Sequence, residues 1–163
     1  MIIDAEKVSP IVPPTALDVE AVTALLGRPP SVGFEVVVMN KAGEPVVIRN
    51  EPIMEDGRPM PTRFWLVCPK LCLAVARLEG KGGVKAAEAE VDQTELSATH
   101  SQYAKERDAL IPSEYSGPRP SGGVGGTRRG VKCLHTHLAH YLFTGEDPVG
   151  AWIVEKLEEG CFA

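Results

Sequence analysis

The chain has 163 residues, of which 44% are hydrophobic and 24% charged, and its formal net charge is −5. This composition is that of a globular protein large enough for one buried core, and the acidic balance argues against general binding to nucleic acids or anionic membranes. No apolar run reaches the ~20 residues of a membrane-spanning helix and MIIDAEKVSP has no secretory signal, so we expect a cytoplasmic protein whose residues 1–163 form a single domain.

The first half of the chain carries the signals for one helix and three strands. Residues 1–14 are expected to form an extended lead-in. Thr15 and Asp18 have the spacing of a capping box and Gly27 marks a C-terminal stop, which together predict a helix. Segments rich in β-branched residues predict strands at 34–39, 45–48 and 63–67, separated by a turn at 40–43 and a proline-containing loop at 51–61.

The second half predicts helices separated by glycine and proline. Proline suits the first helical position, so Cys68-Pro69 begins a helix, which ends at residues 80–83. The others are expected from Asp92 to near Pro112, after the Gly/Pro-rich loop 113–130 to about Phe143, and from Asp147-Pro148 onward. This order predicts an α+β fold, in which a small, mainly antiparallel sheet of about three strands packs against four to five helices.

Residues 116–145, SGPRPSGGVGGTRRGVKCLHTHLAHYLFTG, combine glycines and basic side chains without a single Asp or Glu. Glycine tolerates positive φ and lets backbone N–H groups turn toward an anion. We therefore predict that this segment binds a small anionic ligand, a phosphate or carboxylate, through Gly123, Gly125, Gly126, Arg128 and Lys132. It matches neither a phosphate-binding P-loop nor a dinucleotide fingerprint. The alternative is a flexible linker with solvated charges.

Two cysteines lie where helices are predicted to begin. A helix N-terminus favours a thiolate over a thiol, so Cys68 and Cys133 are candidate nucleophiles, and Lys132 and His137 can lower the pKa of Cys133 further. The alternative is that both cysteines are small buried apolar residues. His100 shares its predicted helix face with Leu96 and Tyr103, which favours a core histidine.

The spacing after Cys133 allows three geometries. A helix that includes Cys133 places it on one flank with His137 and His140, and His135 on the opposite flank. An extended segment up to His137 points Cys133, His135 and His137 the same way. A helix that begins only near Thr136 leaves Cys133 and His135 in a loop, where they can converge.

A zinc ion is the metal that this residue set predicts. Tetrahedral Zn²⁺ takes four Cys or His ligands in a structural site, or three and a water in a catalytic site. The candidate ligands are Cys68, Cys133, His135 and His137, with His100 as a further alternative.

The segments PMPTRFWLVCPKL, ARLEGKGGV, GGVGG and VKCLHTHLA resemble a bacterial family known as domain of unknown function 501, from about Arg28 to Gly150. The resemblance implies that Cys68, Cys133, His135 and His137 are hallmark positions of the family, whereas Cys72, Cys161 and His140 are not. Family members in actinobacteria often lie near genes for a septum-formation initiator and an exopolyphosphatase. The resemblance thereby implies a link to cell division or phosphate metabolism.

Two functions follow as hypotheses. The first is an enzyme, a hydrolase or transferase, in which the basic loop holds an anionic group and a cysteine thiolate or metal-bound water attacks it. Its catalytic residues would be Cys133, His135, His137 and Cys68. The second is a non-catalytic cell-division or regulatory module, in which the Cys/His cluster is a structural zinc clasp or plain core.

Overall fold

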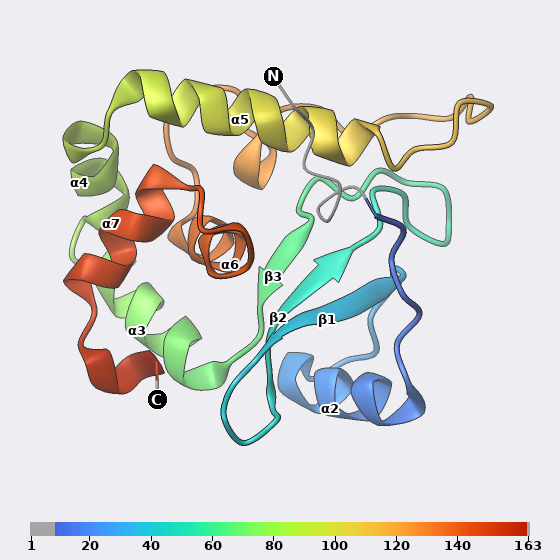
Figure 1. The fold of residues 1–163 in the computed structure, drawn as a ribbon, viewed down its shortest axis with the longest axis horizontal. Coiled ribbons are helices and arrows are strands. Elements are labelled where there is room, and N and C mark those ends of the chain that lie inside the picture. The colour runs from blue at the N-terminus through green and yellow to red at the C-terminus, as the bar shows by residue number, and fades with distance from the viewer. Residues whose placement is uncertain (1–8, 163) are drawn as a thin grey trace.

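The computed structural model describes residues 9–162 (Figure 1). The predicted lead-in lies outside the described residues up to position 8. In chain order the elements are α2 (Ala16–Leu26), β1 (Phe34–Met39), β2 (Pro45–Asn50), β3 (Phe64–Leu66), α3 (Pro69–Gly80), α4 (Gly83–Glu90), α5 (Gln93–Asp108), η1 (Val124–Gly126), α6 (Leu134–Thr144), α7 (Pro148–Lys156) and η2 (Glu159–Phe162). Within residues 9–162 no helix combines the length and apolar character needed to cross a membrane.

The α+β prediction is confirmed. The three strands form one antiparallel sheet in the order β1-β2-β3. β1 and β2 are a hairpin in which Phe34 pairs with Asn50, and a register shift falls between Val36 and Val38. β3 is shorter than expected and pairs through Leu66 with Val47. Among the described residues, helices contribute far more than the three short strands, and the sheet is small.

The sheet has an apolar core on each face. On one face, Val22 of α2 packs with Phe34 and Ile48, and Val22 and Ile48 are completely buried. On the other face, residues of β2 and β3 join a larger core with Leu138 of α6. Figure 1 shows α2 beside the β1–β2 hairpin and α3 to α7 gathered beyond β3. In β3, Phe64 and Leu66 face the larger core and Trp65 the smaller one, because successive side chains point to opposite faces.

Local signals set most helix ends as predicted. Thr15 and Asp18 form both halves of the capping box, and Gly27 ends α2 with φ 72°. The exception is α4, which the sequence analysis does not predict. Its segment, GVKAAEAE, consists largely of good helix formers, but the glycines at 80–83 are interpreted only as the end of the preceding helix.

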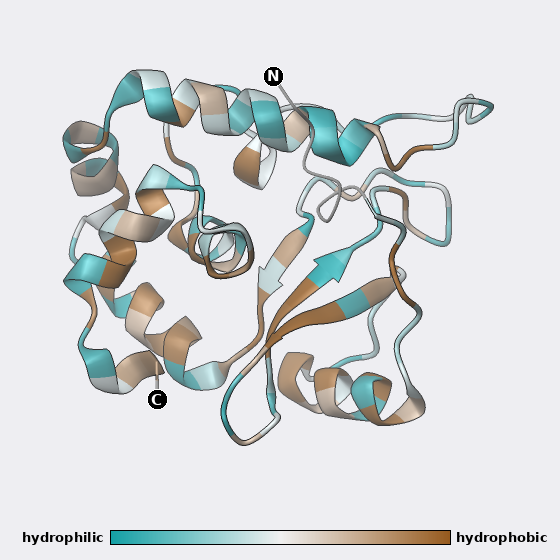
Figure 2. Ribbon diagram, in the orientation of Figure 1, coloured by the Kyte–Doolittle hydropathy of each residue, from teal (hydrophilic) through white to brown (hydrophobic). Residues whose placement is uncertain are grey.

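Helix α5 has a polar buried face. In Figure 2 it is mostly hydrophilic, whereas β1 and β2 are largely brown apart from a teal band in β1 and the teal arrowhead of β2. The hydroxyl of Tyr103 accepts a hydrogen bond from the Arg63 N–H at 2.7 Å and donates one to the Pro61 carbonyl at 3.0 Å. Through Tyr103, α5 therefore holds the backbone at Pro61 and Arg63 by hydrogen bonds as well as by apolar contact.

Candidate functional site

Cys133 lies at the N-cap of α6. Its backbone is extended, with φ −148° and ψ 125°, and the helix begins at Leu134. His135 is therefore in the first helical turn, with its Nδ1 3.8 Å from Cys133 Sγ. The third alternative is right in placing Cys133 before the helix, but wrong in starting the helix near Thr136, because α6 begins at Leu134 and includes His135.

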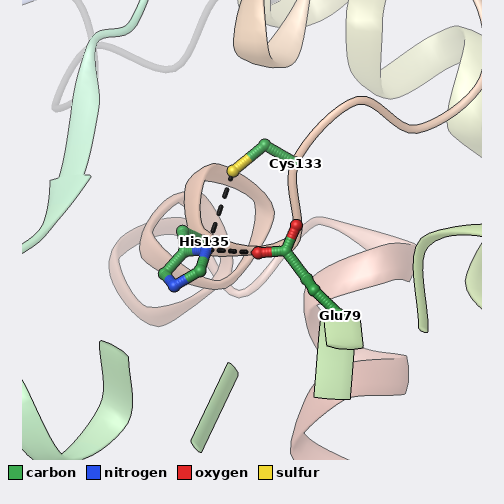
Figure 3. A group of neighbouring side chains, drawn as sticks. All are labelled: Glu79, Cys133 and His135. Atoms are coloured by element: carbon green, nitrogen blue, oxygen red, sulfur yellow. Dashed lines mark hydrogen bonds and ion pairs between the residues drawn. The ribbon is translucent and has the colours of Figure 1, made fainter. Parts of the chain in front are cut away.

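Glu79 completes a three-residue cluster with Cys133 and His135 (Figure 3). It comes from the last turn of α3, and its Oε1 lies 2.6 Å from His135 Nδ1. The side chains of His135 and Glu79 are 29% and 25% exposed, so small molecules can reach them. Sequence reasoning did not select Glu79, because a glutamate near a helix end resembles any solvated surface residue.

Both nitrogens of the His135 ring face hydrogen-bond acceptors. Nδ1 faces the Glu79 carboxylate and Cys133 Sγ, and Nε2 lies 3.1 Å from the backbone carbonyl of Cys72. A neutral imidazole has only one N–H, so this environment favours the doubly protonated imidazolium. The hydrogen bond with Cys133 is the main cause that raises the pKa of His135 to about 9, and the Cys72 carbonyl adds to it.

The surroundings of Cys133 favour its thiolate. Burial of the sulfur opposes ionisation, but the His135 side chain and the backbone N–H groups of Thr136 and His135 outweigh it, so the pKa of Cys133 lies below its ordinary value. The nearby Glu79 carboxylate acts in the opposite direction. A thiolate beside an imidazolium at a helix N-terminus is the arrangement of an activated cysteine.

His137 belongs to a different, buried network. Its Nδ1 lies 2.8 Å from Asp147 Oδ2, and Nδ1 of His140 lies 2.9 Å from the same oxygen. Asp147 also caps α7 by accepting from the N–H groups of Val149 and Gly150. Burial of the carboxyl raises its pKa, but the bonds to His137 and His140 outweigh this and leave the pKa below its ordinary value. The network joins α6 to α7, and the sequence analysis assigned only a capping role to Asp147.

Cys68 is also separate from the cluster. It is the N-cap of α3, partly buried, and lines a hollow together with Cys161 and Phe162. Among residues 9–162, the single group of three or more candidate metal-binding side chains is Glu79, Cys133 and His135. The four predicted zinc ligands therefore do not gather around one point. The structure brings together Cys133 and His135, adds Glu79, and leaves out Cys68 and His137.

The glycine-rich loop, residues 122–126, is tightly held. The N–H of Gly123 donates to Thr127, that of Gly126 donates to Gly123, and that of Val124 donates to Nδ1 of His100 at 3.1 Å. A Cβ on Gly123 would lie 2.5 Å from His100 Nδ1, so only glycine fits there. Two of the three glycine amides expected to face an anion, those of Gly123 and Gly126, thus bond within the protein, as does the amide of Val124.

The ring of His100, on α5, forms hydrogen bonds with this loop through both of its nitrogens, and these bonds define its tautomer. Its Nδ1 accepts from Val124, so Nε2 carries the proton and donates to the Gly130 carbonyl at 2.9 Å. Burial lowers the pKa of His100, which agrees with a neutral ring. Arg107, seven residues further along α5, donates to the Gly122 carbonyl at 2.7 Å. The predicted core role of His100 thus includes positioning the loop.

The loop lies against the first turn of α6. A Cβ on Gly125 would lie 3.5 Å from Thr136 Oγ1 and 3.8 Å from Lys132 Cβ. Lys132 and Arg128 are exposed. The basic side chains are therefore free to contact solutes beside the helix that carries Cys133 and His135.

These features define an α+β protein with a half-buried Cys/His/Glu cluster where α3 meets α6. The chain belongs to the family described as "Protein of unknown function (DUF501)", whose model matches residues 36–155. The resemblance of the sequence to this family is thereby confirmed. No curated protein and no solved structure matches the chain. Because the family description names no activity, the function is argued from the site.

Proposed function

We propose that the protein is an enzyme, a hydrolase or transferase, that uses the thiolate of Cys133 to attack a small substrate carrying a phosphate or carboxylate group. The observation that carries this proposal is the set of contacts made by the His135 ring. It meets the Cys133 sulfur, the Glu79 carboxylate and the Cys72 carbonyl. A histidine surrounded by acceptors stays protonated and stabilises an adjacent thiolate.

The three side chains then have distinct roles. The Cys133 sulfur forms a bond to the electrophilic carbon or phosphorus, and the bond to the leaving group breaks as it receives the Nδ1 proton of His135. Water, or a second hydroxyl or thiol in a transferase, then attacks the same carbon or phosphorus and gives its proton to the neutral Nδ1 of His135. The bond to sulfur breaks, and Cys133 leaves as the thiolate. Glu79 holds the ring in place through the 2.6 Å contact.

The exposed basic side chains support an anionic substrate. Arg128 and Lys132 lie on the segment that joins the glycine-rich loop to α6. Because several loop amides already have partners, side chains rather than backbone N–H groups supply the binding charge. We also propose a cytoplasmic location, since a reducing compartment preserves free thiols such as the cysteines seen here.

An activity screen tests this proposal. Reduced, metal-free protein is assayed on phosphate esters and thioesters, with Cys133→Ser and the control Cys161→Ser, which changes a thiol in η2. We expect turnover that Cys133→Ser abolishes and Cys161→Ser retains, with little change in the thermal midpoint of either variant. Turnover that persists in Cys133→Ser would rule out the thiolate mechanism.

A non-catalytic module is the second candidate function. The buried bonds of His137 and His140 to Asp147 favour it, because part of the expected Cys/His cluster then serves to join two helices. On this proposal Cys133→Ser lowers stability and no substrate in the screen is turned over.

A further inference from the structure

We infer that Glu79, Cys133 and His135 form a binding site for a thiophilic divalent metal ion, Zn²⁺ above all, with three protein ligands and an open fourth position. The inference goes beyond the proposed activity, because metal binding requires neither a substrate nor a nucleophilic cysteine. It also differs from the ligand set expected from the sequence, which lacked Glu79 and included two residues that lie elsewhere.

The chemistry of the donors selects the metal. A thiolate, an imidazole and a carboxylate are the three ligand types that Zn²⁺ takes in proteins. Ca²⁺ and Mg²⁺ prefer sites made of oxygen alone, so the Cys133 sulfur disfavours them. The two anionic ligands balance the charge of the ion, and binding displaces one proton from His135 Nδ1.

The distances are close to those of a tetrahedral site. The three donor atoms lie within 4.8 Å of one another. Zinc bonds of about 2.3 Å to sulfur and 2.0 Å to nitrogen and oxygen place sulfur and nitrogen about 3.6 Å apart, and nitrogen and oxygen about 3.3 Å apart. The observed Sγ–Nδ1 distance is 3.8 Å and the Nδ1–Oε1 distance 2.6 Å. The Nδ1–Oε1 pair is closer than a shared metal allows, so Glu79 has to withdraw from His135, and its side chain is long and partly exposed.

The surroundings hold His135 as a ligand requires. Metal-bound histidines usually donate the other ring N–H to a carbonyl or carboxylate, which fixes the ring and its tautomer. Here Nε2 lies 3.1 Å from the Cys72 carbonyl, which leaves Nδ1 for the metal. The partial exposure of His135 and Glu79 provides a path for the ion and room for a fourth ligand from solvent.

The buried network around Asp147 is a poorer candidate. Its carboxylate already accepts bonds from two imidazoles and two backbone amides, and it is 3% exposed. A metal there would replace satisfied hydrogen bonds without gaining a sulfur ligand. The half-buried cluster is therefore the site that the structure assigns to a metal.

Cobalt and zinc titrations test this inference. Reduced, metal-free, full-length protein is titrated with Co²⁺, whose spectrum reports sulfur ligation through a charge-transfer band, and with Zn²⁺ in competition with a chromophoric chelator. We expect one ion per chain and a sulfur band. Cys133→Ser should remove the band, Glu79→Gln and His135→Asn should weaken Zn²⁺ binding, and Cys161→Ser should match the wild type. Circular dichroism melts confirm that each variant is folded.

The outcomes separate this site from the proposed enzyme. Wild-type Zn²⁺ affinity in Cys133→Ser, or a Co²⁺ complex of the wild type without a sulfur band, would overturn the metal site and leave the thiolate mechanism intact. If the site is real, one equivalent of Zn²⁺ protects Cys133 from iodoacetamide and EDTA restores the reaction. Alkylation at an unchanged rate in the presence of saturating Zn²⁺ also contradicts the inference.

Discussion

At the scale of single residues, the position of His135 controls the chemistry of Cys133. One Nδ1–H is shared between Glu79 at 2.6 Å and the Cys133 sulfur at 3.8 Å, so the carboxylate holds the proton more closely. The hydrogen bond with the His135 ring is still the largest effect that lowers the pKa of Cys133, and the amides at the start of α6 lower it further. Removal of the ring should therefore leave a thiol that the helix end activates only weakly.

The pH dependence of alkylation measures this effect. Iodoacetamide reacts with the thiolate, so the rate at Cys133 in metal-free protein should reach half its maximum below the ordinary thiol value of about 8.5. His135→Asn should move that midpoint to higher pH, because the variant loses the cation that lowers the pKa of Cys133. Peptide mapping by mass spectrometry resolves each cysteine, and Cys161 serves as the internal reference. Identical midpoints in wild type and variant would contradict the coupling.

Residue types alone identified two of the three members of the cluster. Cys133 and His135 could be selected because they are rare, close in sequence and next to a predicted helix start. Glu79 lies more than fifty positions away and is one of many acidic residues in an acidic chain. His137 resembled His135 in sequence, but α6 turns it into the core, where it meets Asp147. Such partners depend on how helices pack, which local patterns do not encode.

At the scale of elements, α5 works as a polar support for the glycine-rich loop. His100 and Arg107 lie seven residues apart, about two helical turns, and so point to the same side. Between them they bond backbone at Gly122, Val124 and Gly130. The sequence predicted the helix and the loop separately, but the hydrogen bonds that join them require side chains to meet across long sequence separations.

Substitution of His100 tests this support. His100→Ala loses both bonds to the loop, whereas His100→Asn retains an acceptor for the Val124 N–H. Each lost bond costs about 1 kcal/mol. Hydrogen exchange of amides 122–130 should therefore be slowest in the wild type, faster in His100→Asn and fastest in His100→Ala. Equal protection in all three proteins would show that apolar packing alone positions the loop.

At the scale of the whole molecule, the sheet separates two apolar cores, and Leu134, the residue between Cys133 and His135, is buried in the larger one. Val22 of α2 packs in the smaller core, with Phe34 and Ile48, whereas Leu138 of α6 packs in the larger core on the other face of the sheet. The α+β class was predictable because helix caps, turns and β-branched runs are local signals. The distribution of the helices over the two faces was not, since it depends on which apolar surfaces fit together.

This separation predicts that stability and thiol reactivity respond differently to core substitutions. Val22 and Leu138 are both completely buried. Val22→Ala should lower the free energy of unfolding by about 2 kcal/mol and Leu138→Ala by about 3 kcal/mol, from lost burial and the cavity left behind. Only Leu138→Ala should also change the alkylation rate of Cys133, because it loosens the helix that carries the thiol. Urea unfolding and site-resolved alkylation on the same samples give both quantities.

The contradicting outcome is a change in Cys133 reactivity in Val22→Ala as large as that in Leu138→Ala. It would mean that the two cores are coupled through the sheet. The site would then depend on the fold as a whole rather than on the contact of α3 with α6.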